Sequence, residues 1–146
     1  MSTVFRYMVT VLVVDDQQVF RDAVRSLIAA ADGFEQVGEA DSGLKALEIA
    51  EELHPDVVLL DVRMPGMDGI ETARRLADQD PETVVVLVSL DEVPELPAAV
   101  SAVGAAAYIR KQDLSPRTLE EIWSSYGRGG TSSAGSQVKP LVDDGM

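Results

Sequence analysis

Short apolar runs recur along this chain, and polar residues follow each of them. Residues 9–14 and 57–60 are followed by aspartates, a third run ends at Ser89, and a fourth precedes Lys111. Between the runs, apolar residues recur every three or four positions, which is the spacing of a helix that buries one face. Continuous apolar runs this short indicate parallel strands that are buried on both faces.

The alternation predicts an α/β fold built from five strand–helix units. Strands are expected at residues 9–14, 36–40, 57–60, 83–88 and 106–109. The inward faces of the helices are expected to include Val19, Phe20, Ala23, Val24, Leu27, Ile28 and Ala31, then Leu44, Leu47, Ala50 and Leu53, then Ile70, Ala73, Leu76 and Ala77, and finally Leu119, Ile122 and Trp123. Such units form a parallel sheet with helices on both faces.

Prolines mark the start of the last two helices. Pro94 and Pro97 delay the fourth helix, which is expected to be short and to lie near residues 98–103. The last helix has Ser115 as its cap and Pro116 in its first turn, where the missing N–H is not needed.

Length and composition fit one domain. The chain has 146 residues, 46% of them hydrophobic, and no cysteine, which excludes disulfides and thiolate chemistry. No apolar run approaches the roughly 20 residues that cross a bilayer, and the first residues lack the apolar core of a secretory signal. We therefore expect a cytoplasmic protein that does not bind membranes. Its parts are expected to be an extension over residues 1–8, a domain over 9–126 and a flexible Gly/Ser-rich tail over 127–146.

The net charge of −13 argues against nucleic acid as a direct partner. Residues 1–126 hold 23 acidic and 10 basic side chains, so they carry all of this charge. Nucleic-acid phosphates are bound through basic surfaces, and an acidic domain would repel them.

Chemistry is expected at one edge of the sheet. Parallel strands end at the same edge, so Asp15, Asp16, Asp61, Ser89 and Lys111 should meet there. Three close carboxylates repel each other without a cation, and hard oxygen ligands suit Mg²⁺. A hydroxyl and an ammonium group can bind phosphoryl oxygens. The set predicts phosphoryl transfer to a carboxylate, with Asp61 as the candidate nucleophile.

Four motifs resemble those of the receiver domain of two-component response regulators. They are Val11-Leu-Val-Val-Asp15-Asp16, Leu59-Leu-Asp61-Val-Arg-Met-Pro-Gly-Met-Asp-Gly69, Val88-Ser89 and Tyr108-Ile-Arg-Lys111, and the resemblance covers residues 9–126. It implies a flavodoxin-like fold, and a sensor histidine kinase that phosphorylates Asp61. It also implies Mg²⁺ near Asp15, Asp16 and Asp61, with the backbone carbonyl of Arg63 as a further ligand.

The same resemblance implies a switch. The residues at Ser89 and Tyr108 would respond to phosphorylation and repack the face formed by the fourth helix, fifth strand and fifth helix, through which a homodimer would form. Self-phosphorylation from small donors and autodephosphorylation would follow from the same site. The pattern around Tyr108 and Ser115 is similar to the LuxR/NarL subgroup, whose members usually carry a DNA-binding output domain. No such module is present in this sequence, and a stand-alone receiver and a fragment of a longer regulator both remain open.

Three alternative functions fit the sequence less well. A haloacid-dehalogenase-type phosphatase needs a second aspartate two residues after its nucleophile, and Arg63 stands there. A flavin-binding module needs a hydroxyl-rich phosphate loop after the first strand, where two aspartates and two glutamines stand. A receiver that works without phosphorylation is motivated by Leu90 and the prolines of the fourth helix, whereas the complete acidic set argues against it.

His54 is expected to be a surface residue, without a zinc site or a phosphocarrier role.

Overall fold

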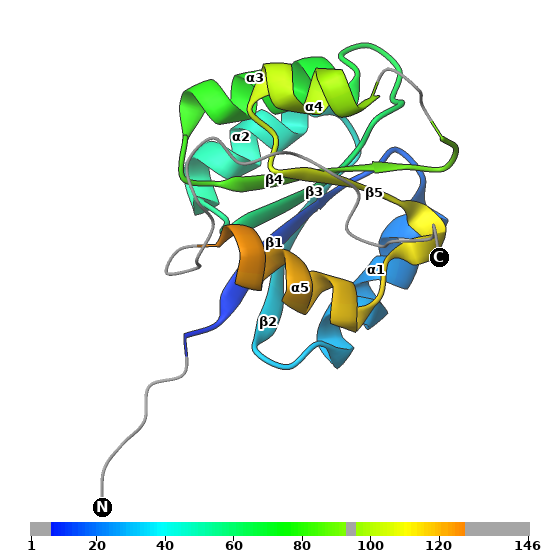
Figure 1. Ribbon diagram of the computed structural model, residues 1–146, viewed down its shortest axis with the longest axis vertical. Helices are drawn as coiled ribbons and strands as arrows, with labels where there is room; N and C mark the ends of the chain where they lie inside the picture. The colour runs from blue at the N-terminus through cyan, green and yellow to red at the C-terminus, as the bar shows by residue number, and fades with distance from the viewer. Residues whose placement is uncertain (1–6, 93–95, 128–146) are drawn as a thin grey trace, which may run out of the picture.

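The five strands form one parallel sheet in the order β2-β1-β3-β4-β5 (Figure 1). The computed structural model describes residues 7–92 and 96–127. The strands are β1 (Val9–Val14), β2 (Phe34–Ala40), β3 (Val57–Asp61), β4 (Val84–Ser89) and β5 (Ala107–Arg110). The helices are α1 (Gln18–Ala30), α2 (Gly43–Leu53), α3 (Gly69–Gln79), α4 (Leu96–Val103) and α5 (Pro116–Tyr126), with a short 3₁₀ turn η1 (Lys111–Asp113) after β5. The predicted flavodoxin-like class, with five parallel strands and five helices, is confirmed.

The sheet separates two hydrophobic cores. Helices α2, α3 and α4 cover one face, and α1 and α5 cover the other (Figure 1). Neighbouring residues of a strand point to opposite faces, so Leu12 and Leu60 enter the first core while Val13 and Leu59 enter the second. All four are fully buried, which explains why the central strands read as continuous apolar runs.

Helix starts follow local hydrogen-bonding rules. At α5, Ser115 Oγ accepts a hydrogen bond from the Thr118 amide (3.2 Å), and Thr118 Oγ1 accepts one from the Ser115 amide (2.8 Å), so the expected cap is confirmed. At α3, Asp68 Oδ1 accepts a hydrogen bond from the Glu71 amide (2.9 Å). These caps fix where the loops at the carboxyl edge of the sheet turn into helix.

Some of the predicted inward positions were wrong. Val19 is 81% exposed and Leu44 is 62% exposed, and Ala23 and Leu53 are also exposed. The buried stripe of α1 runs instead through Arg21, Val24 and Ile28. The cause lies in Arg21, whose guanidinium has polar partners inside the fold. Arg21 can therefore be buried at a position where a hydrophobicity pattern predicts one of its apolar neighbours.

Element boundaries also differ in places. Strand β2 begins at Phe34, two residues before its predicted start, because Phe34 pairs with Val9. Helix α4 begins at Leu96, also two residues early, and accommodates Pro97 in its first turn. The observed bounds of β3, β4 and β5 shift by a single residue at one or both ends. Pro94 lies outside the described residues.

Part of the predicted N-terminal extension is anchored at the amino ends of the strands. The Tyr7 hydroxyl donates a hydrogen bond to Asp56 Oδ1 (2.6 Å), and its ring stacks on Trp123 with centroids 6.5 Å apart. Asp56 is buried just before β3, and its Oδ2 also accepts hydrogen bonds from the amide (2.9 Å) and hydroxyl (3.1 Å) of Thr10. The division into extension, domain and tail remains a prediction, because residues 1–6 and 128–146 lie outside the described part of the chain. Among the described helices, none has the length and apolar character needed to span a bilayer.

Candidate functional site

Three aspartates meet at the carboxyl ends of the two central strands. Asp15 and Asp16 follow β1, Asp61 ends β3, and carboxylate oxygens of the three lie within 4.8 Å of one another. Asp15 and Asp61 are buried, whereas Asp16 is exposed at the mouth of the cluster. The sequence analysis expected these residues to meet because parallel strands end at the same edge of the sheet, and β1 and β3 are direct neighbours there.

Lys111 reaches the same cluster from the end of β5. Its Nζ lies 2.8 Å from Asp15 Oδ2 and 3.8 Å from Asp61 Oδ2, and its side chain is mostly buried. Asp15 Oδ2 is buried and makes no hydrogen bond of acceptable geometry, so the ammonium balances its charge as an ion pair. One ammonium group is therefore shared between two carboxylates.

Burial and like charge raise the pKa of Asp61 to about 6. Burial of its carboxyl group is the largest cause, and the Asp15 charge adds to it, whereas Lys111 and the Arg63 amide lower the pKa. The Arg63 amide donates a long hydrogen bond to Asp61 Oδ1 (3.4 Å). The carboxyl group is thus ionised at neutral pH but costly to hold in this form.

The donor set suits a hard divalent cation. Three carboxylates at the edge of a sheet offer oxygen ligands, and the exposed position of Asp16 leaves room for water, which Mg²⁺ retains when it binds proteins. The poorly satisfied Asp15 Oδ2 is an oxygen that a cation could take over from Lys111.

Ser89 and Tyr108 lie on β4 and β5, the two strands beyond β3 in the sheet. Ser89 ends β4, next to β3, and its hydroxyl donates a hydrogen bond to the Asp91 carbonyl (2.8 Å). Tyr108 lies on β5 and is half-buried against the core beneath α2, α3 and α4. Burial, with a smaller contribution from Glu92, raises the pKa of the Tyr108 phenol. The structure therefore brings Asp15, Asp16, Asp61 and Lys111 together and places the two predicted switch residues on the adjoining strands.

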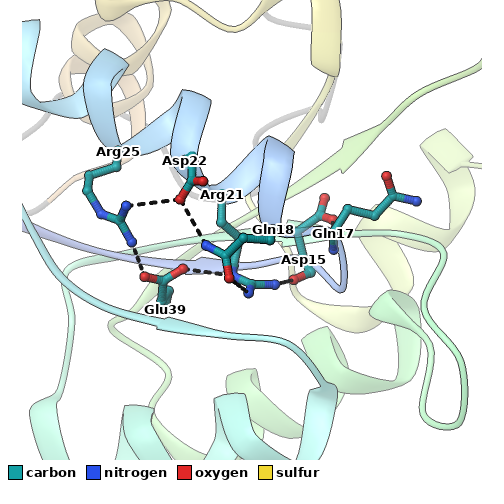
Figure 2. A network of polar contacts seen from close by, with 7 residues as sticks. All are labelled: Asp15, Gln17, Gln18, Arg21, Asp22, Arg25 and Glu39. Atoms are coloured by element: carbon teal, nitrogen blue, oxygen red, sulfur yellow. Dashed lines mark hydrogen bonds and ion pairs between the residues drawn. The ribbon is translucent and has the colours of Figure 1, made fainter.

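Arg21 is a residue of this region that the sequence analysis missed (Figure 2). Its Nη1 donates a hydrogen bond to the Asp15 carbonyl (2.5 Å) and its Nε to Glu39 Oε1 (2.7 Å), while Nη2 donates to Gln18 Oε1 (2.6 Å). Arg25 forms a second ion pair with Glu39. The guanidinium thus ties α1 to the ends of β1 and β2, and the Gln17 amide holds Asp15 Oδ1 from the other side (2.8 Å). The sequence did offer one signal for Arg21: it is a basic residue at helical spacing from the buried Val24 and Ile28.

Gly69 lies directly against the backbone at the end of β3. It is the first residue of α3, and its amide donates a hydrogen bond to the Val62 carbonyl (2.8 Å). A β carbon at this position would overlap the carbonyl oxygen of Asp61. Only a residue without a side chain allows α3 to start this close to the end of β3.

Comparison with known proteins agrees with this geometry. The model of the response regulator receiver domain matches residues 11–122. The chain belongs to this family. It is therefore a receiver domain of the kind found in two-component systems, as its motifs predicted.

The relatives of this receiver domain include regulators of the LuxR/NarL type. It is 44% identical over 104 residues to the response regulator GacA of Pseudomonas viridiflava, a match that covers 71% of this chain and 49% of that protein. It is 37% identical over 110 residues to the nitrate/nitrite response regulator NarL of Escherichia coli K12, covering 75% and 50% of the two chains. The chain thus spans about half the length of the curated relatives it matches.

Solved structures give the same assignment. The response regulator domain of Thermotoga maritima CheB matches with a TM-score of 0.71 and 32% identity, covering 79% of this chain and 93% of that one. A LuxR-family DNA-binding response regulator from Staphylococcus aureus matches with a TM-score of 0.71 and 29% identity, covering 79% and 95%. The receiver fold and the subgroup resemblance are both confirmed.

Proposed function

We propose that this receiver domain accepts a phosphoryl group on Asp61 from a sensor histidine kinase in the cytoplasm. The observation that carries the proposal is the convergence of Lys111 and three carboxylates at the end of β3. An ionised Asp61 oxygen would attack phosphorus, the bond from phosphorus to the donor would break, and the leaving group would keep the electron pair. The product is an acyl phosphate on Asp61.

Each neighbouring residue has a distinct role in this reaction. Mg²⁺, held by Asp15, Asp16, Asp61 and the Arg63 carbonyl, would neutralise charge on the incoming phosphoryl group. Lys111 would bind a phosphoryl oxygen and thereby give up its pairing with Asp15. Its present position, nearer Asp15 than Asp61, leaves Asp61 the less strongly paired of the two buried carboxylates.

The output of the reaction is a change of protein surface. Ser89 would exchange its hydrogen bond to the Asp91 carbonyl for a phosphoryl oxygen, and Tyr108 would repack on β5. This movement would alter the face formed by α4, β5 and α5, where we propose that a homodimer forms. Transcription would then be regulated through an output domain outside the receiver, and the acidic receiver itself would not touch nucleic acid or membrane.

Intact-protein mass spectrometry tests the chemistry directly. Incubation with Mg²⁺ and acetyl phosphate should add a single phosphoryl group to the wild type, and subsequent removal of donor should show its loss by autodephosphorylation. Asp61→Asn should gain none. Asp56→Asn is the matched control, because Asp56 is also a buried aspartate but immediately precedes β3, at the amino end of the strand.

The outcomes separate the alternatives. An adduct that requires both Mg²⁺ and Asp61, and survives in folded Asp56→Asn, supports the proposal. An adduct that persists in Asp61→Asn would show that Asp61 is not the acceptor. If neither acetyl phosphate nor any sensor histidine kinase tested gives an adduct while Mg²⁺ binds, the receiver acts without phosphorylation and the proposal fails.

A further inference from the structure

The ammonium group of Lys111 has an aromatic neighbour as well as its two carboxylates. Nζ lies 4.3 Å from the centroid of the Phe20 ring. A cation within about 6 Å of a ring face is attracted by the negative charge of that face, and burial strengthens the attraction. The Lys111 side chain is only 15% exposed, so water screens the contact weakly.

The position of Phe20 is fixed by the fold. It lies on the first turn of α1 and packs against the core formed by α1, α5 and the sheet. The next residue, Arg21, ties the same turn to the carbonyl of Asp15 (2.5 Å). The ring is therefore held at a set place relative to the acidic cluster rather than lying on a mobile surface side chain.

The ring differs from the carboxylates in one respect that bears on the reaction. In the proposed phosphoryl transfer, Asp15 would engage the cation and Asp61 would become an acyl phosphate, so both charged partners of Lys111 change. The Phe20 ring takes no part in metal binding or bond formation. The ring can therefore attract the ammonium group both before and after the transfer.

We propose that Phe20 is a positioning residue that holds Lys111 over the acidic cluster while its anionic partners exchange. This inference rests on the proposed function, because Lys111 must bind the phosphoryl group for its position to matter. Phe20 touches neither donor nor metal in this proposal and acts through Lys111 alone. Without the ring, the four-carbon stem of the lysine gains freedom that must be lost again at each transfer.

The first test measures the rate of phosphorylation by acetyl phosphate at saturating Mg²⁺. Phe20→Leu keeps an apolar side chain but loses the ring, and we expect the rate to fall about three- to ten-fold. Phe20→Tyr keeps the ring face and should restore a rate within about two-fold of the wild type. Phe34→Leu is the matched control, because Phe34 belongs to the same core but lies at the far end of β2, and its rate should equal that of the wild type.

A second background separates positioning from a general loss of packing. In Lys111→Gln the ammonium is gone, so adding Phe20→Leu should cause no further fall in the rate, although it should still lower the melting temperature. The protons on the Lys111 ε carbon supply an independent signature. They should resonate upfield in the wild type and Phe20→Tyr because they face a ring, and lose that shift in Phe20→Leu.

Each result is decisive. A wild-type rate in Phe20→Leu, or an equal fall in the Lys111→Gln background, overturns the role of Phe20 while leaving Asp61 as acceptor. Absence of the upfield shift in the wild type shows that the ring and the lysine are apart in solution and also overturns it. Failure of the wild type to gain any phosphoryl group removes the proposed function and, with it, this inference.

Discussion

Gly69 packs against Asp61 so closely that a β carbon on the glycine would overlap the aspartate's carbonyl oxygen. The obstacle is backbone, which cannot rotate away as a flexible side chain could. We expect Gly69→Ala to lower the free energy of unfolding by about 3 kcal/mol, because either α3 or the end of β3 must shift. Urea denaturation followed by circular dichroism measures this change.

Gly38→Ala provides the comparison for that experiment. A β carbon at Gly38 would lie 3.4 Å from side-chain carbons of Ile49 and Leu53, an ordinary contact distance. Its free energy of unfolding should stay within about 1 kcal/mol of the wild type. Equal losses in the two variants would mean that the close approach at Gly69 does not govern stability.

The raised pKa of Asp61 predicts that the free energy of unfolding depends on pH. Its folded-state pKa of about 6 exceeds that of the unfolded chain, so the folded protein binds the proton more tightly. This contribution favours folding at low pH and is lost as pH rises from about 4 through 6. Without Mg²⁺, Asp61→Asn should therefore gain stability relative to the wild type over this range, reaching about 1–2 kcal/mol at pH 7 after allowance for solvent screening.

Paired denaturation curves at pH 4 and pH 7 measure the effect. The advantage of Asp61→Asn should be small at pH 4 and should shrink again at pH 7 when Mg²⁺ is added, because a bound cation stabilises the ionised wild type. An advantage that does not change with pH would show that burial of the charge is not its source.

Arg21 should control the affinity of the acidic cluster for Mg²⁺. Arg21→Lys keeps the positive charge, but an ammonium cannot serve the Asp15 carbonyl and Glu39 in the planar arrangement of a guanidinium. Loss of the contact frees the end of β1, and we expect the dissociation constant for Mg²⁺ to rise about three- to ten-fold by titration calorimetry.

Arg25→Gln is the control that separates the Arg21 contact with Asp15 from the ion pairs with Glu39. Arg25 also pairs with Glu39 from the same helix, yet among the described residues it makes no hydrogen bond or ion pair with Asp15 (Figure 2). Its Mg²⁺ affinity should stay within about two-fold of the wild type. If Arg25→Gln weakens Mg²⁺ binding as much as Arg21→Lys does, the effect comes from Glu39 and not from the carbonyl of Asp15.

The Tyr7 hydroxyl should contribute to stability at the other end of the sheet. Tyr7→Phe keeps the ring on Trp123 and removes the hydrogen bond to Asp56, so we expect a loss of about 1 kcal/mol. Tyr7→Ala removes both contacts and should lose more. Thermal unfolding should show Tyr7→Ala to be less stable than Tyr7→Phe. If the two variants are equally unstable, the hydroxyl accounts for the whole contribution of Tyr7 to stability.

The convergence of the acidic cluster and Lys111 could be predicted from the sequence because strand ends are easy to locate. Continuous apolar runs mark buried parallel strands, and parallel strands deliver their next polar residues to one edge. Asp15, Asp61 and Lys111 each follow such a run, so their convergence needed no knowledge of side-chain conformation. Sites built from strand ends are therefore more predictable than sites built from helix faces.

The supporting residues could not be read in the same way. Arg21 and Phe20 lie on α1, where a shift of one position in the buried stripe changes which side chain meets the cluster. Val19 competes with Arg21 on any hydrophobicity scale, and only the acceptors supplied by Asp15 and Glu39 explain why the charged residue is inside. Those acceptors are 6 and 18 residues away in sequence and become neighbours only once the sheet has formed.

The stacking of Tyr7 on Trp123 gives the protein an optical probe in a useful place. Trp123 is the chain's single tryptophan, so all indole emission comes from the last turns of α5, beside the amino ends of the strands. The acidic cluster lies at the carboxyl ends, across the full length of the sheet. A change in that emission when Mg²⁺ or a phosphodonor is added would report a signal that has travelled through the domain, not the filling of the cluster itself.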